Sequence, residues 1–206
     1  MIKTKHLFLV FIFVIVSCLF VSCDVLEDLP NSQYKVGNTV RYGEYNGHQI
    51  EWIVLDRVDD KALLLSKYLL SQRQYNSSND AVTWSDSSIR SWLNDYFYYN
   101  AFSYSDRLGI VDSYVANDSN SAFGTSGGRN TYDKVFLLST YEVGRYCSSS
   151  NIQAEYRNGD IAGWWLRSPG YISSYAAFVN AYGTISGVGD RVNKDGGIRP
   201  AIWITL

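Results

Sequence analysis

The sequence contains few of the residues that usually build metal centres or covalent cross-links. Its 206 residues include only three cysteines and two histidines, and most of these lie in the first 23 positions. Beyond that segment, Cys147 and His48 each stand alone. A zinc site needs several thiolate or imidazole ligands at short spacings, and a disulfide needs two thiols. The sequence therefore predicts neither a zinc site nor an intrachain disulfide in the folded part.

Charged residues are also scarce, at 18% of the chain, and the formal net charge at pH 7 is only −2. Because no basic stripe is present, we predict no nucleic-acid partner. Aromatic residues, in contrast, reach 16%, with 17 Tyr, 9 Phe and 6 Trp. This length and composition predict one globular domain, not a disordered chain or two domains.

The N-terminal segment has the layout of an export signal. Lys3 and Lys5 precede an apolar run from Leu7 to Val16, and small residues and cysteines follow. The stretch LFVSC, which ends at Cys23, resembles the lipobox of bacterial lipoproteins. The resemblance implies that this cysteine carries lipid and becomes the first residue of the mature chain.

Cys18 is the alternative lipidation site, since IVSC fits the same motif. Cleavage there would leave three further apolar residues on the mature N-terminus, which favours Cys23. We therefore predict a signal peptide over 1–22, a lipidated tether over 23–36 and a folded domain over 37–206. The protein is expected to be exported and anchored by lipid to a bacterial cell membrane or outer membrane.

The folded part is expected to have strands near both ends and helices between them. Alternating apolar residues and turn signals predict early strands, and brief apolar runs predict late ones, at 38–45, 48–58, 61–70, 164–167, 176–180, 184–186 and 198–204. Apolar spacings and caps predict helices after Trp84, at 105–110 and at 140–147, the last preceded by a buried strand at 134–139. This order favours an α+β domain with short antiparallel sheets, in which the terminal strands pair, and two or three central helices.

Several motifs, taken in order, resemble one bacterial family of exported and surface proteins. They include VGNTVRYGEY, IEWIVLD, ALLLSKYLL, WSDSSIRSWLN, DKVFLLSTYEV, GWWLRSPG, AAFVNAYGTI and GGIRPAIWI. Over about 36–206 the chain resembles the family catalogued as domain of unknown function 6273, which implies no particular activity. The closing motifs are similar to the C-type-lectin-like fold of formylglycine-generating enzymes, which implies a C-type-lectin-like domain. The paired cysteines of those enzymes are missing here, so their copper chemistry is not implied.

The motifs GWWLRSPG and GGIRPAIWI are predicted to brace the fold, through Trp164, Trp165, Arg167, Pro169, Gly170, Arg199 and Pro200. Adjacent tryptophans in a strand point to opposite faces, so one is expected to fill the core and the other to cover a loop or line a groove. Buried arginines need carboxylate or carbonyl acceptors and would tie loops to the sheet. The prolines and the glycine are expected to fix a turn and a strand edge.

Tyr, Ser, Asn and Gly dominate the segment after this turn, and this mixture is typical of adaptable binding surfaces. The candidate ligand-binding residues are Tyr171, Tyr175, Asn180, Tyr182 and Asp190. Together they could form a patch that suits a protein or a glycan. The alternative interpretation is that they only decorate short strands and turns.

Calcium is suggested by weaker patterns. Asp118, Asp190 and Asp195 lie in loops rich in Asp and Asn, and carboxylate oxygens suit a hard cation. Neither loop has an EF-hand pattern or a Glu-Pro-Asn sugar-binding signature, so ordinary turns are favoured. We predict no cofactor, with calcium at these three residues as the alternative.

No catalytic residue is predicted. His48 is expected near a hairpin turn, and no G-x-S-x-G elbow is present. Among Asp133, Glu142, Glu155 and Asp160, two would have to lie about 5 to 9 Å apart to hydrolyse a glycosidic bond. We therefore predict a non-catalytic module that binds a protein or a glycan. A glycan-acting envelope enzyme and a purely structural envelope protein are the alternatives.

Overall fold

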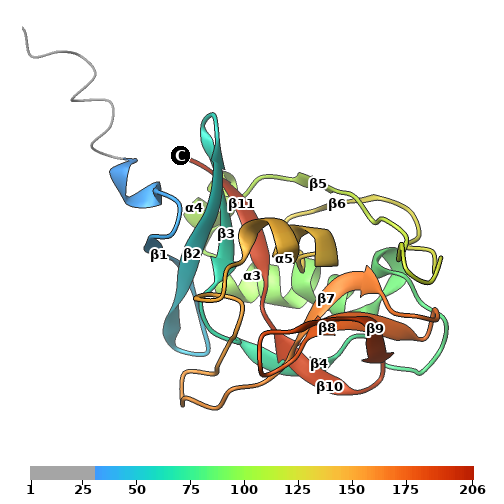
Figure 1. Ribbon diagram of the computed structural model, residues 1–206. Helices are drawn as coiled ribbons and strands as arrows, with labels where there is room; N and C mark the ends of the chain where they lie inside the picture. The colour runs from blue at the N-terminus through green and yellow to red at the C-terminus, as the bar shows by residue number, and fades with distance from the viewer. Residues whose placement is uncertain (1–30) are drawn as a thin grey trace, which may run out of the picture. The chain divides into compact units, whose positions relative to one another are not determined.

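The computed structural model describes residues 31–206 (Figure 1). The predicted signal peptide 1–22, both candidate lipidation sites, Cys18 and Cys23, and positions 23–30 of the tether lie outside the described residues. Within the described range, no helix has the length and apolar character needed to cross a membrane.

Strands from both ends of the described chain form a first sheet in the order β1-β2-β3-β11, and every pairing in it is antiparallel. Its strands are β1 (Thr39–Tyr45), β2 (His48–Val58), β3 (Lys61–Ser66) and β11 (Ala201–Thr205). The three early strands are confirmed, although the third ends at Ser66. The terminal strands share this sheet but do not pair with each other. β11 pairs with β3, and β1 forms the opposite edge.

A second sheet has the order β4-β10-β7-β8-β9. Its strands are β4 (Ser71–Gln74), β7 (Trp164–Pro169), β8 (Tyr175–Val179), β9 (Ile185–Arg191) and β10 (Asp195–Ile198), and a separate pair is formed by β5 (Ser113–Val115) and β6 (Thr131–Asp133). The β10–β7 pairing is parallel, which departs from the expected antiparallel sheets.

The predicted strand 198–204 is two strands that belong to different sheets. β10 ends at Ile198 and β11 begins at Ala201. Pro200, between them, has no N–H to give to a ladder. The chain therefore leaves the second sheet at this point and enters the first.

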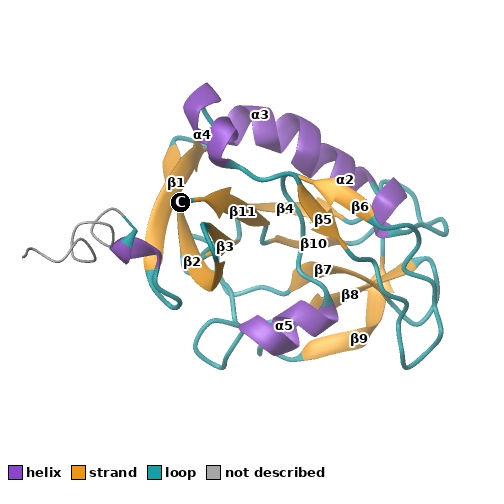
Figure 2. Cartoon of the chain, turned by 90° about the horizontal axis from the view of Figure 1, so that it is seen from above, coloured by secondary structure: helices purple, strands orange, loops and turns teal. Residues whose placement is uncertain are grey.

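One short helix, η1 (Ser32–Tyr34), precedes β1. The others occupy the middle of the chain: η2 (Trp84–Asp86), α2 (Ser88–Trp92), η3 (Leu93–Phe97), α3 (Tyr98–Ala101), α4 (Tyr104–Gly109) and α5 (Thr140–Tyr146). The helix expected after Trp84 is confirmed as a continuous run from α2 to α3, with a π-helical turn at η3. Capping boxes at Ser103 and Ser139 begin α4 and α5. Seen from above, α2 and α3 lie along one side of the strands and α5 along the other (Figure 2). The expected mixed class is confirmed, with mostly sheet and few helices.

The segment 134–139 is buried, but the prediction that it forms a strand is wrong. A single isolated bridge joins Phe136 to Ala201. The side-chain oxygen of Asn94 accepts the first two N–H groups of the segment, and Arg167 donates to one of its carbonyls. Since side chains satisfy these backbone groups, the segment can be buried without a ladder.

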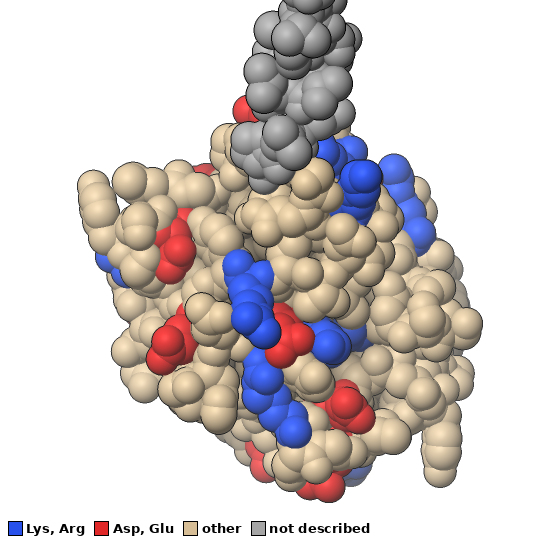
Figure 3. Space-filling view, turned by 90° about the vertical axis from the view of Figure 1, so that its left-hand side faces the viewer, with Lys and Arg blue, Asp and Glu red and all other residues tan. Residues whose placement is uncertain are grey.

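On the face that Figure 3 shows, Lys and Arg side chains gather in a band down the middle, and Asp and Glu side chains lie beside the band and around it. Glu51 in β2 is bound by Lys67 at 3.1 Å and by Arg157 at 3.3 Å. The Lys67 hydrogen bond lowers the pKa of Glu51. This face therefore lacks the single-sign field that attracts nucleic acid over long distances.

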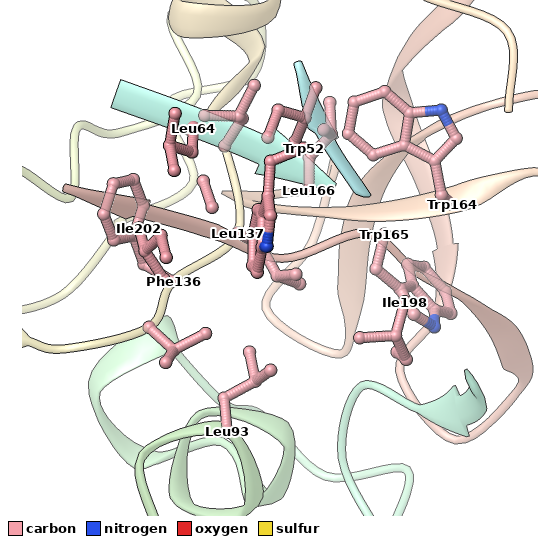
Figure 4. Packing of buried hydrophobic residues seen from close by; sticks show 14 of the residues in the cluster. Trp52, Leu64, Leu93, Phe136, Leu137, Trp164, Trp165, Leu166, Ile198 and Ile202 are labelled. Atoms are coloured by element: carbon pink, nitrogen blue, oxygen red, sulfur yellow. The ribbon is translucent and has the colours of Figure 1, made fainter. Parts of the chain in front are cut away.

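Apolar side chains from both sheets and from the α2–α3 helix form one core (Figure 4). Trp164 and Trp165 leave β7 on opposite sides, as the alternation of a strand requires. Both are buried, with exposed fractions of 0% and 3%. Their indole N–H groups donate to the carbonyls of Ile152 and Arg73.

Arg167 joins three segments of the chain. Its guanidinium donates to the carbonyls of Ala116 and Leu137 and forms a two-pronged ion pair with Glu142 at the start of α5. Tyr75 donates its hydroxyl to the carbonyl of Arg167. These contacts hold β7, α5 and the chain after β5 together.

Arg199, at 1% exposed, is bound differently. Its guanidinium donates to the carbonyls of Ser66 and Asn151 and lies 5.0 Å from the ring centre of Trp164. No carboxylate in the described part of the chain forms an ion pair with it. Burial lowers the pKa of Arg199 to about 10.

The Pro169–Gly170 turn at the end of β7 is held by a side chain from a distant loop. The amide of Asn120 donates to the carbonyls of Pro169, Gly170 and Gly187. A Cβ at Gly170 would lie 2.6 Å from the Cβ of Tyr175, so the close approach needs a glycine.

Candidate functional site

A pocket of about 180 Å³ lies on the second sheet and is the strongest candidate site. We call it the tryptophan pocket. It is lined by Gln72, Tyr156, Ala162, Gly163, Trp164, Trp165, Phe178, Asp190, Lys194, Asp195, Gly196 and Gly197. It therefore combines three aromatic side chains of the sheet and Tyr156 with polar side chains from other segments.

Glycines without side chains allow the aromatic part of the pocket to form. A Cβ at Gly196 would lie only 2.5 Å from Nε1 of Trp165, so the indole packs directly against the β10 backbone. Phe178 is the register partner of Trp165, and their ring centres are 6.2 Å apart. The sequence thus places the half-buried Phe178 ring near the half-buried β10 backbone at Gly196, an arrangement that suits a small polar ring.

The polar side of the pocket has a mixed charge. The Asp190 carboxylate is paired with Nζ of Lys194 at 2.9 Å, whereas Asp195 forms no ion pair in the described chain. The hydroxyl of Tyr156 is buried and has no hydrogen-bond partner among the described residues. Burial, and after it the charge of Asp195, raise the pKa of Tyr156, so its hydroxyl keeps its proton at neutral pH.

A second pocket of about 440 Å³ adjoins the first, and we call it the Trp92 pocket. Both pockets are lined by Gln72 and Asp195. Arg73 lies over the Trp92 ring at 4.2 Å from its centre, and Tyr96 stacks with the same ring at 6.4 Å. The indole N–H of Trp92 is a second buried group without a partner in the described chain.

The five residues predicted to bind a ligand are not gathered in one patch. Tyr171 and Tyr175 lie at one end of the β8–β9 hairpin, with ring centres 4.8 Å apart. Asn180 and Tyr182 lie at its other end, where the Asn180 side chain accepts two backbone N–H groups of the turn. Asp190 is the member of this set that lines the tryptophan pocket.

The calcium candidates also lie in different surroundings. Asp118 is exposed in the loop after β5, whereas Asp190 and Asp195 line the tryptophan pocket. Across residues 31–206, no group of three or more His, Cys, Asp or Glu side chains is arranged to hold a metal ion.

Two of the carboxylates considered for catalysis serve the fold. Asp133 is 1% exposed and accepts hydrogen bonds from Trp84, Arg90 and Thr131. Glu142 is held by Arg167.

The other residues considered for chemistry are exposed. Glu155 and Asp160 lie in the same loop between α5 and β7, where an isolated bridge joins Glu155 to Ile161, and His48 lies at the start of β2. Cys147 is half-buried, and burial raises the pKa of its thiol, which disfavours the reactive thiolate.

Sequence reasoning missed Gln72, Trp92, Tyr156 and Lys194. They come from segments far apart in the chain, and no local motif links them. The pair Gly196–Gly197 beside Asp195 was the one available indication, because consecutive glycines in a strand often mark a close approach to the backbone.

The geometry describes a small mixed α/β domain with two adjoining polar and aromatic pockets. The sequence model of a protein family described as "Domain of unknown function (DUF6273)" matches residues 59–206. The chain belongs to this family. The match begins at Asp59, later than Val36, so β1 and all of β2 precede it. Comparisons with curated proteins and with solved structures gave no match.

Proposed function

We propose that this is an exported lipoprotein of the bacterial cell envelope, anchored through Cys23, whose domain binds a ligand without catalysis. The observation that carries the binding role is the tryptophan pocket, where an unpartnered Tyr156 hydroxyl lies among aromatic rings and a free Asp195 carboxylate. Few buried polar groups in native proteins lack a partner, and a bound ligand would supply one here. The ligand is a glycan or a protein of the envelope.

Binding is favoured over glycan hydrolysis by the state of the carboxylates. In the pocket, Asp190 is neutralised by Lys194, and Glu142 and Asp133 are committed to arginines elsewhere. A hydrolase of the usual kind needs two carboxyl groups that face one bond from two sides. The tryptophan pocket offers hydrogen-bond recognition by Gln72, Tyr156 and Asp195 instead.

We also propose that the fold is C-type-lectin-like. In support, both ends of the folded chain enter one sheet, and the motifs GWWLRSPG and GGIRPAIWI lie together in β7, β10 and β11. An experimental structure superposed on C-type-lectin-like domains tests this. A different strand order in the two sheets would refute it.

Lipid anchoring is tested by metabolic labelling with a fatty-acid analogue. Cys23→Ser should abolish labelling and release the protein from membranes, because the modified thiol is lost. Cys18→Ser is the matched control and should stay labelled. If Cys18→Ser loses the label and Cys23→Ser keeps it, the anchor is Cys18. Labelling that survives the double substitution refutes the lipoprotein assignment.

Ligand binding is tested with the full chain in detergent, on a glycan array and against the solubilised envelope fraction, each with and without calcium. Gln72→Ala and Asp195→Ala should reduce binding, whereas Asp118→Ala, in a distant exposed loop, should not. Binding that ignores both pocket variants would place the site elsewhere. Absence of any ligand in both assays would favour a purely structural envelope protein.

A further inference from the structure

The two adjoining pockets share an unusual feature. Three buried side-chain atoms in residues 31–206 have no hydrogen-bond partner: Nε1 of Trp92, Oδ1 of Asn117 and the hydroxyl of Tyr156. Two of the three belong to residues that line these pockets, one in each. Gln72 and Asp195 line both pockets and so lie between them. Unpartnered groups at neighbouring positions point to one ligand that serves both.

The unpartnered groups define part of the ligand's chemistry. An indole N–H can only donate, and the Tyr156 hydroxyl is protonated and can donate as well. The ligand must therefore bring an acceptor oxygen to each pocket. Asp195 has no ion pair in the described chain and can accept hydrogen bonds. The ligand should therefore carry hydroxyl or amide donors between its two acceptor oxygens.

The volumes of the two pockets indicate the length of the ligand. At about 180 Å³, the tryptophan pocket is smaller than most ligand pockets, which span about 300–1,000 Å³. The Trp92 pocket, at about 440 Å³, extends it beyond Gln72 and Asp195. One small ring fits the first pocket, and a chain of rings is needed to occupy both.

We propose that the two pockets are adjacent subsites for an oligosaccharide of N-acetylated sugars, with Gln72 and Asp195 between successive units. This inference rests on the proposed binding function and names its ligand class. The acetamido carbonyl is a strong acceptor for Tyr156 in one subsite and Trp92 in the other. Sugar hydroxyls donate to Asp195, and the apolar face of a sugar ring packs against the half-buried ring of Phe178.

The test is isothermal titration calorimetry on the full chain in detergent, with N-acetylglucosamine oligomers of one to four units as probes. Maltose oligomers of equal length, which lack the acetamido group, are the matched ligands. Affinity should rise at least about tenfold from one N-acetylglucosamine unit to two, because the second subsite is filled without a new loss of translational freedom. Maltose oligomers should bind at least about tenfold more weakly.

Two substitutions separate the subsites. Tyr156→Phe removes the first unpartnered hydroxyl and should weaken binding of every length about fivefold. Trp92→Phe removes the second donor and should weaken the dimer, trimer and tetramer by a similar factor while leaving the monosaccharide unchanged. Gln72→Ala, at an exposed position that tolerates truncation, should weaken only the longer oligomers. Tyr104→Phe, in exposed α4, is the control and should change nothing.

Thermal unfolding distinguishes this role from a structural one. Removing a hydroxyl that has no partner should leave the melting temperature of Tyr156→Phe equal to or above that of the wild type, although its affinity falls. A lower melting temperature would show that the hydroxyl is bonded within the fold and would overturn the proposal.

The remaining outcomes are equally decisive. Monosaccharide binding without a length dependence would retain the proposed function and overturn the two-subsite arrangement. Failure of all N-acetylglucosamine oligomers, together with pocket-dependent capture of an envelope protein, would overturn the sugar class while the binding function stands. Failure of every probe and of the envelope assay would remove the proposed function itself.

Discussion

At the scale of single residues, the charges of two buried arginines are compensated in two different ways. Arg167 has a carboxylate partner, whereas Arg199 relies on carbonyl groups and an aromatic face. A buried guanidinium that loses its partner is costly, because its charge is no longer compensated in a medium of low polarity. The free energy of unfolding should therefore be sensitive to the replacement of a single carboxylate oxygen in the ion pair of Arg167 with Glu142.

Glu142→Gln tests this ion pair. The substitution keeps the shape of the side chain and its cap on α5 but leaves the Arg167 charge unpaired. We expect a loss of about 2–3 kcal/mol in the free energy of unfolding, measured by urea denaturation. Glu155→Gln, at an exposed carboxylate, is the control and should lie within about 0.5 kcal/mol of the wild type. Equal stability of the two variants would contradict the bracing role.

Tyr75 makes stability depend on alkaline pH. Burial raises its pKa above the usual value, so the folded state holds a proton that the unfolded state releases above about pH 10. The contribution of Tyr75 to the free energy of unfolding is therefore complete below pH 10. Above pH 10 it declines as pH rises, by about 1.4 kcal/mol per pH unit. Tyr75→Phe should cost about 1 kcal/mol at pH 7, since its bond to Arg167 is lost.

Urea denaturation of Tyr75→Phe between pH 10 and 11.5 should show a shallower decline than the wild type. Tyr104→Phe, at 72% exposed, should follow the wild-type curve. A Tyr75→Phe slope equal to that of the wild type would show that the phenol is not buried in its protonated form.

At the scale of elements, β7 and β10 are joined by the indole of Trp165, which packs directly on the backbone of Gly196. Gly196 permits this contact because a Cβ there would overlap Trp165. The pocket and the sheet therefore depend on the same glycine.

Gly196→Ala should destabilise the domain by about 2 kcal/mol through overpacking and should also weaken ligand binding. Gly144→Ala provides a comparison of opposite sign. Gly144 lies inside α5, a Cβ there meets nothing within 4 Å, and the change should stabilise by about 0.5–1 kcal/mol. Both values come from chemical denaturation. A neutral Gly196→Ala would contradict the packing described here.

At the scale of the whole molecule, the sequence predicted elements better than their arrangement. Alternation and capping residues act within a few positions, so β1 to β3, α4 and α5 were identifiable. The segment 134–139 was misjudged because Asn94 and Arg167, distant in the chain, satisfy its backbone. The tryptophan pocket was not predicted as a site: Trp164 and Trp165 were expected to brace the fold, and Asp190 and Asp195 were named in separate ligand and calcium hypotheses. Its polar residues meet only after the second sheet has formed.

The central claim is that the tryptophan pocket binds a component of the cell envelope. Carboxyl footprinting tests it most directly, with the full chain in detergent labelled by a carbodiimide and glycinamide and read by mass spectrometry. Adding the solubilised native envelope fraction should reduce labelling of Asp195 several-fold and leave Asp118, an exposed carboxylate outside the pocket, unchanged. Unchanged labelling of Asp195, or equal protection of both residues, would contradict the claim.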